Sequence, residues 1–230
     1  SDRMKLSAWK ELLNQTVTVT QQCTQTVATA LGATQENVDA VMPGGTGTDI
    51  LTNKVNGTEL DGADIYSSVA VLAAVCNANP VVFLKYPFAY VFRGLGLEVE
   101  SESLAHRVGS AATVGNCVPG VIDMILTIDD FYARKFAYLV GLLDSVVEGD
   151  GKVPDNTAAV WFQSASDGPA HNLNNMPIVQ AGSAGGYFKT GQSVNVESGA
   201  DDPLLLGRSE AVCTPGTLTS VTSGTATGTV

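Results

Sequence analysis

The sequence predicts an α/β domain with a mostly parallel sheet that is covered by helices. Two observations carry this prediction: a long helical pattern over 119–148, and two short apolar runs, 157–162 and 177–181, that follow it. Near-continuous apolar strands are typical of sheets that are covered on both faces. The 230 residues fit a single domain. Within this domain we expect a helical and irregular part over 1–118, a helix and strand–loop–strand core over 119–197, and a Thr/Ser/Gly-rich tail over 198–230.

The first part contains three helical patterns. Apolar spacing predicts a helix over 5–31, although its centre alternates like a strand. Asp61 is a capping residue for a second helix, whose expected apolar face holds Ile65, Val69, Leu72 and Cys76. A short third helix is expected over 101–112, with Ser101 or Ser103 as its cap.

Proline and glycine mark the other boundaries. Pro87 lies in the middle of the apolar segment 81–92 and excludes a single central strand there. Pro119 suits the first turn of the long helix, and Gly149 ends it. The apolar positions of that helix recur at spacings of three and four: Ile122, Ile125, Leu126, Phe136, Leu139, Leu143 and Val146. The segment 182–191 lacks the spacing of a phosphate-binding loop and is expected to be a glycine turn with positive φ.

The composition excludes several classes of partner. The chain carries 12 basic against 23 acidic residues, a net charge of −11, and has no cluster of Lys or Arg. Binding to nucleic acid or to an anionic membrane surface needs such a cluster, so neither is expected. No apolar run is long enough to span a bilayer.

The low charge and the abundant Thr, Ser, Asn and Gly favour an exported protein, located in the periplasm, at the cell surface or outside the cell. We expect its export signal to have been removed. The four cysteines would form two disulfides in an oxidising compartment, or would be buried thiols.

The candidate site residues lie in the loop between the two apolar runs. His171 follows Asp167 by four residues, and polar side chains at the end of a buried strand are common sites of chemistry. The pair is interpreted as metal ligands or as an acid and a base. The alternative is a loop stabilised by aspartate turn chemistry and a hydrogen-bonded imidazole. The other histidine, His106, is interpreted as a helix-surface residue, with a role as second ligand as the alternative.

Five motifs within 121–197 occur together: Asp155-Asn-Thr157, Val160-Trp-Phe162, Asp167-Gly-Pro-Ala-His171, Asn175-Met-Pro177 and Ala181-Gly-Ser-Ala-Gly-Gly186. In combination they resemble the C-terminal part of a family of uncharacterised exported bacterial proteins related to the sulfatase and alkaline-phosphatase superfamily. The resemblance implies an alkaline-phosphatase-like fold, of which this chain is expected to hold a part.

The resemblance also implies an activity, the metal-dependent hydrolysis of phosphate or sulfate esters. Asp167 and His171 are the positions to which the superfamily's metal ligands carry over. With two histidines in all, the site is expected to be rich in aspartate and to hold one divalent metal ion.

Two other functions remain open. The chain could be a non-catalytic structural or assembly subunit of the cell surface, which associates with itself or with other surface proteins, for example by adding a strand from 218–230. It could also be a binding module for glycans or small ligands, if the aromatic residues of 81–92 line a groove.

Overall fold

The computed structural model describes residues 25–41, 50–55, 57–76, 78–87, 89–106, 120–165, 171, 173, 176–193, 212–214 and 217–219. The chain divides into two compact units: the first is Ser1–Tyr86 with Arg134–Thr157, and the second is Pro87–Ala133 with Ala158–Val230. The expected division of a single domain into parts over 1–118, 119–197 and 198–230 stays a prediction.

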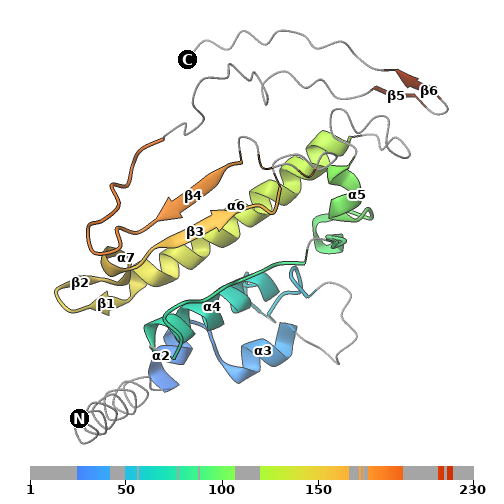
Figure 1. The fold of residues 1–230 in the computed structure, drawn as a ribbon. Helices are drawn as coiled ribbons and strands as arrows, with labels where there is room; N and C mark the ends of the chain where they lie inside the picture. Colours follow the sequence, from blue (N-terminus) through green and yellow to red (C-terminus); the bar gives the residue numbers. More distant parts are fainter. Residues whose placement is uncertain are drawn as a thin grey trace, which may run out of the picture. The chain divides into compact units, whose positions relative to one another are not determined.

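Helices dominate the described residues (Figure 1). In chain order the elements are α2 (Gln25–Ala30), α3 (Gln35–Val41), α4 (Gly62–Val75), η2 (Arg93–Leu95), α5 (Ser101–Ala105), α6 (Val121–Ser145), β1 (Val147–Glu148), β2 (Gly151–Lys152), α7 (Val153–Asn156), β3 (Ala159–Phe162), β4 (Ile178–Ala181), β5 (Val212–Thr214) and β6 (Thr217–Thr219). Of the helix predicted over 5–31, only α2 lies within the described residues. Among all the residues that the structure describes, no helix is long and apolar enough to cross a membrane.

Helix α4 begins at the predicted cap. The Asp61 side chain accepts a hydrogen bond from the Asp64 backbone N–H at 3.1 Å, and the Asp64 side chain accepts one from the Asp61 N–H at 3.0 Å. This reciprocal capping box satisfies two N–H groups at the helix start. The predicted apolar face was right for Ile65 and Cys76, which are buried, and wrong for Val69, which is 44% exposed.

The buried face of α4 includes two serines instead. Ser67 and Ser68 are fully buried. The Ser67 hydroxyl donates to the Ala63 carbonyl at 3.0 Å, and the Ser68 hydroxyl lies 3.4 Å from that of Tyr138. One bond within the helix and one to α6 therefore give these hydroxyl groups partners, which allows polar residues to occupy core positions that an apolar pattern overlooks.

The core of the first unit forms where α3 packs against α4. Val41, Val55 and Ile65 are buried together, and the half-buried side chains around them are Val38, Ala40 and Leu60. Cys76, at the end of α4, is buried and disulfide-bonded. The side chains of the other three cysteines lie outside the described residues.

The long helix predicted over 119–148 is present as α6. Its buried positions are Val121, Ile128, Phe131 and Leu143, whereas Leu126, expected on the apolar face, is 58% exposed. The second unit is built on aromatic packing against this helix. Phe92 is fully buried and makes edge-to-face ring contacts with Phe131 and Tyr132, at centroid distances of 5.5 and 5.7 Å.

The two predicted strands pair with each other. β3 and β4 form an antiparallel hairpin with Ala159 opposite Ala181 and Phe162 opposite Ile178 (Figure 1). β1 with β2 and β5 with β6 are also antiparallel pairs, so the expected mostly parallel sheet is not found among the described strands. Antiparallel neighbours need only a loop between them, whereas parallel ones need a crossover, and no described helix separates β3 from β4. The alkaline-phosphatase-like fold stays a prediction.

The expected glycine turn after β4 is confirmed. Gly182, Gly185, Gly186 and Gly191 all have positive φ, between 71° and 86°. Two glycines in succession with φ near +70° to +85° are compatible with few other residues, which explains the composition of this segment. A separate strand pair lies near the end of the chain. Strand β6, which overlaps the start of the tail segment 218–230, pairs with β5.

Candidate metal site

Helix α5 places a carboxylate and an imidazole on the same side of one turn. Glu102 lies in its first turn, and His106 is the C-cap residue, four positions later. Residues at i and i+4 of a helix are neighbours on its surface. Leu104, between them, is fully buried and anchors the helix in the second unit. The N-cap is Glu100, not the predicted Ser101 or Ser103, and its side chain makes no capping hydrogen bond.

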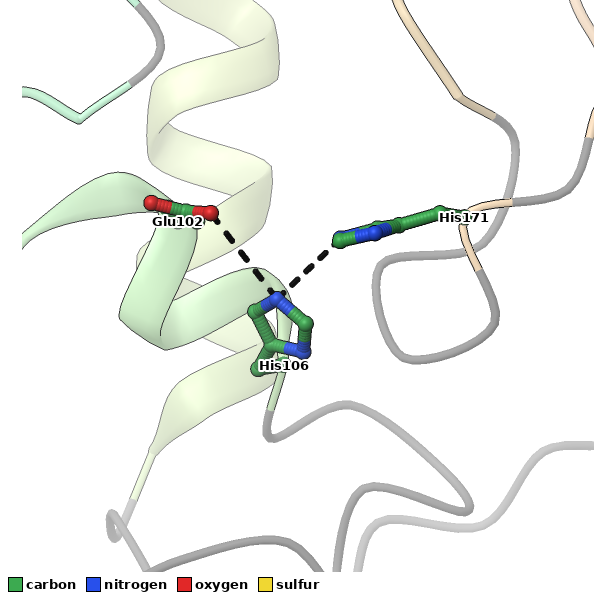
Figure 2. Close-up of side chains that lie close together, drawn as sticks. All are labelled: Glu102, His106 and His171. Atoms are coloured by element: carbon green, nitrogen blue, oxygen red, sulfur yellow. Dashed lines mark hydrogen bonds and ion pairs between the residues drawn. The ribbon is translucent and has the colours of Figure 1, made fainter.

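His171 approaches this pair from the connection between β3 and β4. Its Nε2 lies 3.2 Å from Nε2 of His106, and the two rings meet edge to face with centroids 4.9 Å apart. Figure 2 shows that the contacts with Glu102 and with His171 meet at one ring nitrogen of His106. The Glu102 carboxylate oxygen lies 4.0 Å from this nitrogen. Three potential ligands from two separate segments therefore converge.

The separations are close to those of a metal coordination shell. One donor atom from each of Glu102, His106 and His171 lies within 4.8 Å of the other two. Two ligands on a tetrahedral ion with bonds of about 2.0–2.1 Å lie about 3.3 Å apart. The two imidazole nitrogens already have this spacing, at 3.2 Å. The Glu102 side chain is 37% exposed, so it has room to rotate closer.

His106 also has a polar atom that lacks a partner. Its Nδ1 is buried and makes no hydrogen bond within the described part of the chain. Buried ring nitrogens are normally satisfied, and those that are not often mark a ligand or a water position. A metal-binding histidine uses one nitrogen for the ion and needs an acceptor for the other. His106 is therefore not a solvated surface residue, and if its Nε2 bound an ion, its Nδ1–H would still need an acceptor.

His171 has an unusual backbone conformation. Its φ is +48°, and Ala184 is the only other described non-glycine residue with positive φ. The left-handed region is sparsely populated by residues with a side chain, although histidine is among those enriched in it. Such conformations occur often at ligand-binding sites, where the surrounding structure holds them in place.

The outcome for the predicted site residues is mixed. His171 does belong to a group of potential ligands, while Asp167 lies outside the described residues. His106 was interpreted first as a surface residue and lies instead at the centre of the group, with 24% of its side chain exposed. Glu102 was missed. The Glu-x-x-x-His spacing within a predicted helix was the available signal, since it places both side chains on one face.

A second polar cluster lies in the first unit. The Nζ of Lys135 donates to Asp61 at 2.7 Å and to both carboxylate oxygens of Asp64 at 2.9 Å. Burial raises the pKa of Asp61 and outweighs the opposing effect of the Lys135 ammonium. Burial likewise raises the pKa of Tyr86 to about 12. The Lys135 side chain is 11% exposed, and it links α6 to the start of α4.

Comparison with protein-family models, with curated proteins and with solved structures gave no match for this chain.

Proposed function

We propose that this chain is an exported, metal-dependent hydrolase of phosphate or sulfate esters, with one divalent metal ion held by Glu102, His106 and His171. The observation that carries the proposal is the convergence of both histidines of the chain and a carboxylate within 4.8 Å. Ester hydrolysis is the activity implied by the resemblance of 121–197 to the sulfatase and alkaline-phosphatase relatives, and the ligand set is compatible with it.

The three ligands have distinct tasks. His106 would hold the ion from a half-buried position, and Leu104 keeps its helix in place. His171 would complete the site from the exposed side, and Glu102 would supply negative charge. Three protein ligands leave a coordination position for water or substrate, as catalytic zinc sites do. When bound, a divalent ion lowers the pKa of water and polarises the ester oxygen.

The test combines metal content with turnover. The purified full chain is analysed for bound metals and assayed against p-nitrophenyl phosphate and p-nitrophenyl sulfate. We expect about one divalent ion per chain and a rate of hydrolysis that His106→Ala lowers at least 100-fold. Glu98→Gln is the matched control, because Glu98 is a surface carboxylate of the same unit that pairs with Arg93. A metal-free protein that hydrolyses neither ester would refute the proposal.

The second candidate is a non-catalytic surface subunit that associates with a second copy of itself. Strands β3 and β4 contain no charged residue. Val160, Phe162 and Ile178 lie on one face of their hairpin and are 49–61% exposed. Natural edge strands usually carry charges that prevent pairing, and these two strands have none. Identical hairpins on two copies could meet across a two-fold axis.

Sedimentation equilibrium tests this second candidate. The wild-type chain should be dimeric at micromolar concentration, and Phe162→Lys should be monomeric. A wild-type chain that stays monomeric at several hundred micromolar would exclude assembly through the hairpin.

A further inference from the structure

We propose that the metal, if bound as above, is also a structural cross-link that joins α5 to the β3–β4 connection. We further infer that the site takes a late first-row transition ion such as Zn²⁺ rather than Mg²⁺ or Ca²⁺. This deepens the proposed function and rests on the same three ligands. It adds two claims, the class of ion and the dependence of local order on it.

The class of ion follows from the donor atoms. Two of the three are imidazole nitrogens, which suit zinc, copper, iron and nickel. Magnesium and calcium prefer sites made of oxygen ligands, and calcium takes six to eight of them. Only the Glu102 carboxylate supplies oxygen among the described ligands. A site of this kind discriminates strongly between the two groups of ions.

The cross-linking role follows from the positions of the ligands in the chain. His106 and His171 are 65 residues apart, and without an ion the described contacts between them are one nitrogen–nitrogen hydrogen bond and one edge-to-face ring contact. An ion would replace this bond by coordination from both segments. A link that closes a long loop restricts the unfolded chain more than a link within one helix. Binding energy at such a link therefore becomes stability of the segments that it joins.

Both segments need support of this kind. Helix α5 has five residues and no side-chain N-cap, and isolated helices of this length are unstable in water. On the other side, His171 holds a left-handed backbone conformation. Coordination of its side chain gives this conformation a direct stabilising contact. Both segments would therefore gain stability from an ion.

Hydrogen exchange measured by mass spectrometry tests the proposal on the full chain. The protein is stripped with EDTA and divided into samples with Zn²⁺, Co²⁺, Mg²⁺ or Ca²⁺, and ion binding is measured in parallel by equilibrium dialysis. At a Zn²⁺ concentration 100 times the Kd, exchange in peptides covering 101–106 and 171–178 should slow by about 100-fold. Exchange in α4, in the other unit, should not change. Co²⁺ should act like Zn²⁺, and Mg²⁺ and Ca²⁺ should have no effect.

Variants separate the two claims from the proposed function. His171→Ala changes an exposed residue and should abolish the protection of both segments. Glu102→Gln should reduce this protection in part, and Glu98→Gln should behave as wild type. Zinc binding that protects neither segment would refute the cross-linking role but not the metal site. Equal protection by Mg²⁺ would overturn the class of ion. The absence of binding by every ion would refute the metal site itself.

Discussion

Replacing Lys135 by methionine should destabilise the first unit strongly, because it leaves two buried carboxylates without their cation. Lys135 is 11% exposed, and the side chains of Asp61 and Asp64 are 6% and 7% exposed. Methionine keeps most of the apolar length of the side chain, so the change removes the ammonium and little packing.

The magnitude follows from the bonds that are lost and kept. Removing one partner of a buried ion pair costs about 3–5 kcal/mol. Each carboxylate keeps its capping bond to a backbone N–H, at 3.0 and 3.1 Å, so the charges are not left wholly unsatisfied. We therefore expect a loss near the lower end, about 3 kcal/mol at pH 7. The loss should be smaller at pH 5. Burial already raises the pKa of Asp61, and without the Lys135 ammonium this carboxylate is protonated more readily at pH 5 than at pH 7.

Urea unfolding followed by circular dichroism at 222 nm measures this loss, with the free energy obtained by linear extrapolation. The matched control is Lys152→Met. Lys152 also pairs with an aspartate, Asp144, at 2.6 Å, but both side chains are more than half exposed. Exposed pairs contribute about 0–1 kcal/mol. Equal losses in the two variants, or no difference between pH 5 and pH 7 for Lys135→Met, would refute this account of the cluster.

Two further predictions concern the same unit. Gly62→Ala should destabilise it by about 3 kcal/mol, because an added Cβ would lie 1.7 Å from the Ile50 carbonyl oxygen. Gly141→Ala, in an open position of α6, should instead stabilise it by about 0.5–1 kcal/mol. Thermal unfolding compares the two variants. The folded-state pKa of Asp61 is raised above its ordinary value of 3.8, so the folded state binds more protons and stability falls as pH rises through that window. Asparagine does not titrate in this range but caps a helix about as well as aspartate, so Asp61→Asn should remove this fall. An unchanged pH profile in urea unfolding would contradict the assignment.

Features set by local chemistry were predictable from the sequence. The cap at Asp61 and the extent of α6 depend on residues within one or two turns, where spacing and side-chain type suffice. The partners of Lys135 depend on residues 71 and 74 positions away, and no local pattern indicates them. The same limit applied to strand pairing. Both apolar runs were identified as strands, but the pattern of neither run indicated that the two pair antiparallel with each other.

The candidate site divides in the same way. His171 was singled out for its position in a polar loop, and the Glu102–His106 spacing within a helix was visible in the sequence. Their meeting, across 65 residues, was not. A histidine in an otherwise ordinary helix is usually a surface residue. His106 differs from one in its contact with His171 and in its buried Nδ1, which makes no hydrogen bond among the residues that the structure describes.

X-ray absorption at the zinc edge tests the central claim, the two-histidine and one-carboxylate site, most directly. The full chain loaded with one equivalent of Zn²⁺ should give a shell of nitrogen and oxygen at about 2.0–2.1 Å with the outer-shell scattering of two imidazoles. His171→Ala should show one imidazole. A sulfur shell at about 2.3 Å, or a spectrum that lacks imidazole scattering, would place the ion elsewhere and contradict the account.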